Sequence, residues 1–92
     1  MQDMSDDRSI LIRFIDRVHT TPMGVERIKR NLGLKTEDVV SWCKEGIQSP
    51  KSVITRKGKN WYITIDDSVL TVNASSYTII TAHKVKSVRV QQ

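Results

Sequence analysis

The stretch that decides the fold is NWYITIDDSVLTVNASSYTIITAH, residues 60–83. It consists of three short runs of β-branched and aromatic residues, and the polar residues between the runs are typical of tight turns. A fourth run, over residues 52–56, comes before it. We therefore predict four strands joined as an antiparallel meander: Ser52–Arg56, Asn60–Ile65, Ser68–Asn73 and Tyr77–His83. Residues 84–90 alternate cations with valines, which predicts either a longer last strand or a fifth one.

Side chains alternate between the two faces of a strand, so the sheet should have one apolar and one polar face. The apolar face is predicted to hold Trp61, Ile63, Ile65, Leu70, Val72, Ile80 and Ala82. The polar face is predicted to hold Tyr62, Thr64, Thr71, Asn73, Tyr77, Thr81 and His83, with Arg56, Lys57 and Lys59 at its rim. Hydroxyls, an imidazole and cations on one face are groups that bind and orient a phosphodiester.

The first half of the chain repeats like helices. Ser5 is the expected N-cap of a first helix that ends near His19. Its apolar residues are Ile10, Leu11, Phe14, Ile15 and Val18.

Two further helices carry clear boundary signals. Thr21 and Pro22 favour the start of the second helix, and Gly33 its end, with Met23, Ile28 and Leu32 facing the core. Thr36 is the expected cap of the third, which should end near Gly46. Its core-facing residues are Val39, Val40, Trp42, Cys43 and Ile47.

The predicted fold is α+β: three N-terminal helices packed on one face of a four- to five-stranded antiparallel sheet. A length of 92 residues predicts a single domain, with a helical part over about 5–47 and a sheet part over about 52–90. No apolar run is long enough for a membrane helix, and the lone Cys43 cannot form an internal disulfide, so we expect a cytoplasmic protein. We expect no cofactor and no metal site.

The net charge of +5 lies entirely in the second half of the chain. Residues 1–46 hold eight basic and eight acidic side chains, whereas residues 47–92 hold seven basic and two acidic ones. This imbalance favours a polyanionic partner.

The segment Thr20–Lys84 closely resembles a family of small bacterial proteins known as domain of unknown function 3781, which supplies no activity. A more distant resemblance rests on Arg27, Lys29 and Arg30 in the helices and on the string Ile79–Ala82 at the end of the sheet. This layout is similar to the barnase, EndoU and RelE group of ribonucleases. Such enzymes place helices on one side of a four-stranded antiparallel sheet and cleave RNA on the other, generally without metal, by attack of the ribose 2′-oxygen on its own phosphate.

The resemblance implies a metal-independent endoribonuclease of the toxin or phage-defence kind. His83 would be the acid or base, with Arg27 and Thr81 completing the catalytic set. His19 is the candidate for a second acid or base. RNA is favoured over DNA, and the expected nucleic-acid contacts are Arg30, Arg56, Lys57, Lys59, Tyr62 and Lys84.

Two alternatives use the same residues. The segment Thr21–Gly46 followed by the basic hairpin Ile54–Ile65 also resembles a winged helix-turn-helix, which would make the protein a non-catalytic nucleic-acid-binding module, either a regulator or a phage-type inhibitor. The third helix would then read DNA, although Glu37, Asp38 and Glu45 give it an unfavourable charge. The other alternative is an adaptor that pairs with a protein partner or inhibitor through the edge strand Ser52–Arg56. The oligomeric state is left open.

Overall fold

The computed structural model describes residues 4–85, and side chains from residue 8 onward. It is an α+β fold with three helices followed by one antiparallel sheet, as the sequence predicts. The described elements are α1 (Met4–Arg13), the 3-10 turn η1 (Ile15–Arg17), α2 (Pro22–Leu32), α3 (Val39–Gln48), β1 (Val53–Lys57), β2 (Asn60–Ile65), β3 (Ser68–Asn73) and β4 (Ile79–Lys84). The predicted strand over residues 84–90 lies mostly outside the described residues.

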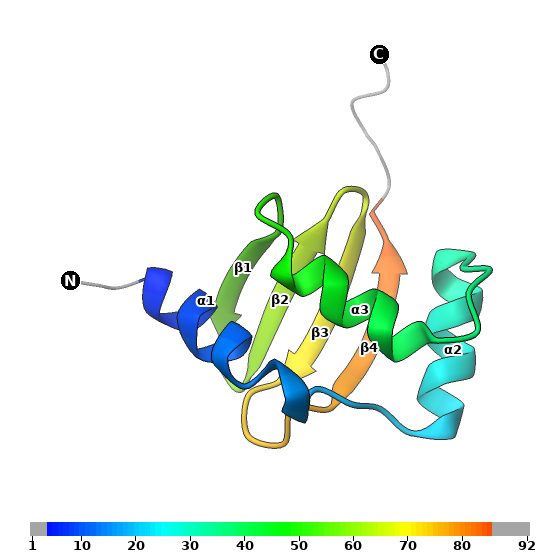
Figure 1. Ribbon diagram of the computed structural model, residues 1–92, viewed down its shortest axis with the longest axis horizontal. Coiled ribbons are helices and arrows are strands. Elements are labelled where there is room, and N and C mark those ends of the chain that lie inside the picture. The colour runs from blue at the N-terminus through cyan, green and yellow to red at the C-terminus, as the bar shows by residue number, and fades with distance from the viewer. Residues whose placement is uncertain (1–3, 86–92) are drawn as a thin grey trace, which may run out of the picture.

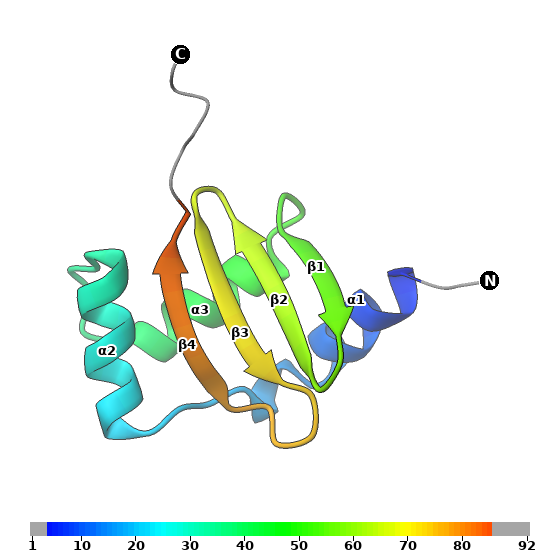
Figure 2. The ribbon, with the colours of Figure 1, turned by 180° about the vertical axis from the view of Figure 1, so that it is seen from behind.

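The helices and the sheet form a layered arrangement. Figure 1 shows α3 crossing in front of the sheet, with α1 beside β1 and α2 beside β4. Seen from behind, in Figure 2, the strands lie uncovered by any described helix. We call this side of the sheet the open face.

The sheet is a four-stranded meander in the order β1–β2–β3–β4. The predicted bounds of β2 and β3 match the structure residue for residue, and β1 lies one residue later than predicted. β1 and β2 are joined by the two-residue turn Gly58–Lys59, in which Gly58 has a φ of 62°. Glycine adopts this left-handed conformation without steric cost, and the turn suits the twist of a hairpin.

β4 differs from the prediction because of a bulge. The pairing shifts between Thr71 and Val72, so that Thr71 lies opposite Thr81 and Val72 lies opposite Ile79. Ile79 is therefore buried, whereas Ile80, predicted to lie in the core, is 43% exposed. An inserted residue reverses the side-chain alternation beyond it, and strict alternation cannot foresee this.

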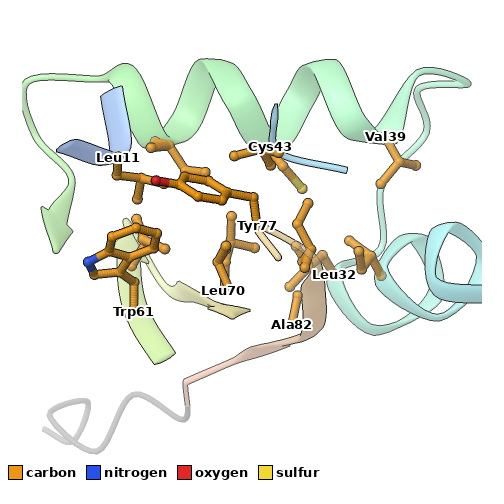
Figure 3. Packing of buried hydrophobic residues seen from close by; sticks show 14 residues of the cluster. Leu11, Leu32, Val39, Cys43, Trp61, Leu70, Tyr77 and Ala82 are labelled. Carbon is orange, nitrogen blue, oxygen red and sulfur yellow. The ribbon is translucent and has the colours of Figure 1, made fainter. Parts of the chain in front are cut away.

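Tyr77 was predicted on the polar face, and this is wrong. It precedes β4, has a φ of 63°, and places its ring in the core with only 5% of its surface exposed. Its ring packs edge-on against Trp61 and Phe14, with centroid separations of 5.3 and 6.2 Å. Figure 3 shows Tyr77 among the buried side chains between α3 and the sheet.

The first helix ends earlier than predicted, at Arg13, with the turn η1 behind it. The chain then becomes extended, because His19 pairs with the segment before β4. The His19 amide donates to the Tyr77 carbonyl (3.1 Å), and the His19 carbonyl accepts from the Ile79 amide (2.8 Å). These sheet-like bonds replace the last helical turn.

The second helix has the predicted boundaries. The hydroxyl of Thr21 accepts from the Gly24 amide (3.0 Å), and Gly33 ends the helix with a φ of 65°. Met23 is not in the core but 73% exposed. It lies outside the stripe formed by Ile28 and Leu32. Met23 is five residues before Ile28, which corresponds to about one full turn plus 140° around the helix, so its side chain points in another direction.

The third helix is capped by Asp38, not by Thr36. The Asp38 carboxylate accepts from the amide and the hydroxyl of Ser41, at 3.0 and 2.9 Å. The helix also runs through Gly46 to Gln48. A β-carbon at Gly46 would lie 2.6 Å from Cδ1 of Ile65, so any larger residue there would require the Ile65 side chain to shift.

One core joins the helices to the sheet. Its fully buried members include Leu11, Ile28, Cys43, Trp61, Ile63 and Leu70. No helix in the described part of the chain has the length and apolar character that crossing a bilayer requires.

Candidate nucleic-acid interface

The strand register assigns the polar residues of the open face to three rows that run across the sheet. One row contains Val53, Thr64, Val69 and His83; the next contains Thr55, Tyr62, Thr71 and Thr81; the third contains Lys57, Asn60 and Asn73. Neighbours within a row are about 5 Å apart, and adjacent rows about 7 Å. Apart from Tyr77, the predicted members of the polar sheet face therefore share one surface.

Tyr62 lies in the middle row, opposite Thr55 on β1 and Thr71 on β3. It is half-buried, whereas its neighbours Trp61 and Ile63 are buried on the other side of the strand. Thr55 is exposed and Thr81 is half-buried, whereas Thr71 is only 8% exposed, so the row offers an aromatic ring and two accessible hydroxyl groups. A ring in such a setting can stack on a base, and hydroxyls can bond phosphate or ribose oxygens.

His83 and Thr81 occupy consecutive positions of the open face on β4, about 7 Å apart. The imidazole is exposed. Among the described residues, no side chain or backbone group hydrogen-bonds to this ring. It is therefore accessible to an incoming ligand.

Helix α2 runs along the β4 edge and brings one arginine, Arg27, beside the open face. Asn31 donates to the Ala82 carbonyl (2.9 Å), which fixes one flank of the helix against β4. Arg27 lies one turn before Asn31 and shares this flank. The opposite flank carries Lys29, which pairs with Glu37 at 3.5 Å in the loop before α3. Arg30 is exposed and lies further round the helix, away from the buried stripe.

Lys57 and Lys59 lie at the opposite corner of the sheet from His83. Lys57 pairs with Asn60 at the first hairpin, three strands and two rows away from His83. With strands about 4.8 Å apart and a rise of about 3.3 Å per residue, this separation is about 20 Å. These lysines and His83 can therefore bind one extended polyanion, but they cannot meet at a single phosphate.

Two predicted contact residues lie off the open face. The guanidinium of Arg56 lies 5.7 Å over the Trp61 ring, and its Nε donates to the Gly58 carbonyl (2.9 Å). Lys84 alternates to the side opposite His83, and its ammonium pairs with Asp67 at 3.5 Å. The structure thus does not bring Arg56 or Lys84 together with His83, Thr81 and Tyr62.

His19 also lies apart from His83. Its Nδ1 lies 2.7 Å from the Arg17 carbonyl, which makes this nitrogen the donor, and its Nε2 lies 3.2 Å from the Thr78 hydroxyl. Thr78 and His83 are five positions apart along the chain, so the two imidazoles are separated by about 15 Å. His19 therefore secures the loop before β4, and a two-histidine acid–base pair is not formed.

Cys43 lies on the side of α3 that faces the sheet, and it is buried in the core. Burial disfavours the charged thiolate and raises the pKa of Cys43 to about 12. A thiol with this pKa is protonated at neutral pH, so Cys43 is a packing residue and not a nucleophile.

Thr55, Asn60 and Ile80 belong to the open face but were not singled out from the sequence. Asn60 belongs to the row of Lys57, where its Oδ1 lies 3.4 Å from Nδ2 of Asn73. The alternation of β2 already places it with Tyr62 and Thr64. Ile80 adds an exposed apolar side chain next to Thr81, and only the bulge reveals it.

Comparison with known proteins identifies the family. A family model described as "Protein of unknown function (DUF3781)" matches residues 12–83, more than three-quarters of the chain, so the chain belongs to this family. This confirms the membership predicted from residues 20–84. No curated protein and no solved structure matches the chain.

Proposed function

We propose that this member of the DUF3781 family binds single-stranded RNA through the open face of its sheet. The observation that carries the proposal is the middle row Thr55–Tyr62–Thr71–Thr81, which offers a ring and the accessible hydroxyls of Thr55 and Thr81 on a sheet face that no described helix covers. We place this activity in the cytoplasm, where the single thiol of Cys43 would stay reduced.

Charge supports a polyanionic ligand. Arg27 on α2 lies beside the β4 edge of the open face, and Lys57 and Lys59 lie at the opposite corner. Within residues 47–85 the only acidic residues are Asp66 and Asp67, in the turn between β2 and β3. An extended strand of several nucleotides would span the roughly 20 Å between Lys57 and His83 and could contact cations at both ends of the open face.

The shape and the hydroxyl groups of the open face favour single-stranded RNA over double-stranded RNA and over DNA. A sheet face is too wide for the deep, narrow major groove of an RNA helix, whereas unpaired bases can stack on an exposed ring. Threonine hydroxyls beside Tyr62 can bond the 2′-hydroxyl, which DNA lacks. The winged-helix alternative has no comparable support, because α3 crosses the sheet and the β1–β2 hairpin is half of a continuous meander.

Substitution of Tyr62 tests the proposal. Tyr62→Ala should weaken binding of a labelled ten-nucleotide RNA by about 5- to 150-fold, because stacking contributes about 1–3 kcal/mol per base. Tyr62→Phe keeps the ring and should bind nearly as the wild type does. Fluorescence anisotropy in 50 mM salt measures both.

A matched pair on α2 provides the charge control. Arg27→Gln should weaken RNA binding, whereas Lys29→Gln, on the other flank of the same helix, should not. Equal losses in the two variants, or a Tyr62→Ala protein that binds as the wild type does, would contradict binding at the open face.

Metal-independent RNA cleavage is the second candidate function. It is favoured by one grouping: His83 and Thr81 share the open face at the β4 edge, next to the helix that carries Arg27. His83 would transfer a proton, Arg27 would balance the added charge on the phosphate, and Thr81 would orient it. The distant His19 leaves His83 without a histidine partner, so water or the substrate would have to supply the second proton transfer.

Incubation of RNA in EDTA between pH 5 and 9 tests for cleavage. If His83 is the acid or base, His83→Ala should lower the rate about 100- to 10,000-fold while RNA affinity stays within a few-fold. The control is His19→Ala, which should keep the rate but lower the free energy of unfolding by about 1 kcal/mol, because it loses two hydrogen bonds. No cleavage by the wild type, or the same cleavage by His83→Ala, would remove the catalytic candidate and leave RNA binding intact.

A further inference from the structure

Each edge of the sheet has a helix beside it, α2 at β4 and α1 at β1, but the two edges differ in whether their outward backbone groups are hydrogen-bonded. At β4 the exposed backbone groups have partners: Ile79 bonds to His19 and Thr20, and the Ala82 carbonyl accepts from Asn31. Helix α2 lies along this edge (Figure 2). Such covering protects an edge strand from pairing with other chains.

β1 forms the other edge, and its register shows which backbone groups point outward. The Ala74 amide donates to the Lys59 carbonyl (2.8 Å), which makes these two residues a hydrogen-bonded pair between β2 and β3. Hydrogen bonding alternates along a strand, so the even-numbered residues of β2 turn toward β1. Val53, Thr55 and Lys57 therefore bond to β2, and the N–H and C=O groups of Ile54 and Arg56 point away from the sheet.

These outward groups are available for pairing. Among the described residues, nothing hydrogen-bonds to the backbone of Ile54 or Arg56, whereas the carbonyl of Ser52, just before the strand, is held by Arg8 at 2.9 Å. Val53 is 59% exposed, and Thr55, Arg56 and Lys57 are exposed as well. The edge thus offers two donors and two acceptors at the spacing that a further strand requires.

The charge of this edge selects the kind of partner. The residues of the strand and its flanks include Lys51, Arg56, Lys57 and Lys59, and residues 50–65 contain no acidic side chain. If a second copy of this chain paired through β1, its four cations would lie against these four cations, and the like charges would repel each other. An acidic segment would instead place carboxylates beside Arg56 and Lys57, and opposite charges across neighbouring strands are favourable.

We propose that β1 is a docking edge for an extended acidic segment of another protein, which adds to the sheet as a fifth strand. In an antiparallel complex, two acidic residues of the partner lie beside Lys57 and Arg56, and small or β-branched residues lie beside Thr55, Ile54 and Val53. Backbone bonds to Ile54 and Arg56 supply affinity, and the two cations supply selectivity. Because Lys57 also belongs to the open face, a docked acidic segment would compete with a polyanion there.

A designed peptide tests this docking without RNA. The probe is the capped, labelled peptide Gly-Glu-Glu-Thr-Val-Thr-Gly, and the charge control replaces both glutamates by lysines. In 50 mM salt the acidic peptide should bind at least tenfold more tightly than the control. Its binding should also slow the exchange of the Ile54 and Arg56 amide hydrogens at least tenfold.

N-methylated peptides separate strand addition from charge attraction. A methyl group on the nitrogen of the second Glu and of Val removes the donors that face β1, and should abolish binding. A methyl group on the nitrogen of the Thr between them, which faces away, should leave the affinity within a few-fold. Arg56→Gln should weaken the binding of the acidic peptide and leave the fold unchanged.

Three results would overturn the proposal. The first is no binding of the acidic peptide at 1 mM. The second is binding that all the methylated peptides share and that leaves the Ile54 and Arg56 amides unprotected. The third is concentration-dependent protection of these amides in the protein alone, which would make a second copy the occupant.

Discussion

Asp38 shows how a single side chain fixes the start of a helix. Its carboxylate accepts hydrogen bonds from the amide and the hydroxyl of Ser41, and these bonds hold the pKa of Asp38 below the usual value of 3.8 for this side chain. The bonds favour the charged carboxylate in the folded protein only. The resulting stabilisation is complete above the unfolded pKa and is lost as the pH falls through the lower, folded pKa.

The variant Asp38→Asn isolates this pH dependence. Asparagine also accepts the Ser41 amide and caps a helix, but it does not titrate. We expect the difference in unfolding free energy between wild type and variant to shrink as the pH is lowered from 5 to below 3.8. Urea unfolding at a series of pH values measures it. A difference that stays constant over this range would contradict the role assigned to the Asp38 charge.

Tyr77 marks the limit of prediction at the residue scale. Its position among serines and threonines before a strand gave no sign of burial, and a bulky residue with positive φ is strained by about 1–3 kcal/mol. The ring is held by contacts distant in sequence: Trp61, Phe14, and the guanidinium of Arg17, 4.6 Å from the ring centroid. Only the tertiary structure brings these groups together.

At the scale of elements, Gly46 sets the approach of α3 to the sheet. An alanine there would favour the helix by about 1 kcal/mol, but its β-carbon would lie 2.6 Å from Cδ1 and 3.4 Å from Cγ1 of Ile65. Overpacking of this kind costs about 1–3 kcal/mol. The packing cost should therefore outweigh the propensity gain.

We expect Gly46→Ala to lower the free energy of unfolding by about 1 kcal/mol, and Ile65→Val to relieve part of this loss by removing the Cδ1 methyl group. Denaturant unfolding of both single variants and the double variant measures the coupling, which should be at least about 0.5 kcal/mol. Additive effects, or a Gly46→Ala protein more stable than the wild type, would contradict this packing.

The elements themselves were largely predictable where local signals and tertiary contacts agree. Thr21 and Pro22 mark the start of α2 and Gly33 marks its end, as expected. The alternating pattern predicts β2 and β3 over the same residues that form these strands in the structure. The errors lie where pairing between distant segments overrides local preference. His19 leaves a helical pattern to pair beside β4, and the bulge next to Val72 exchanges the roles of Ile79 and Ile80.

At the scale of the whole molecule, the meander distributes the basic residues of the second half over different surfaces. Alternation carries Tyr62, Thr81 and His83 to the open face, as the sequence predicts, and turns Arg56 and Lys84 away from it. The presence of a basic residue in a predicted strand or turn does not show which face its side chain occupies. Side chains alternate between the two faces, so a shift of one residue moves a side chain to the opposite face. The placement of Arg27 beside β4 depends on the docking of α2 through Asn31, which no local pattern reveals.

Binding of RNA at the open face is the central claim, and backbone amide chemical shifts test it most directly. A ten-nucleotide single-stranded RNA is titrated into the labelled protein, and shifts are followed residue by residue. The largest changes are expected in the middle row around Thr55, Tyr62, Thr71 and Thr81, and should extend to His83 and Arg27. Changes confined to α1 and α3, or no changes at millimolar RNA in low salt, would contradict the claim.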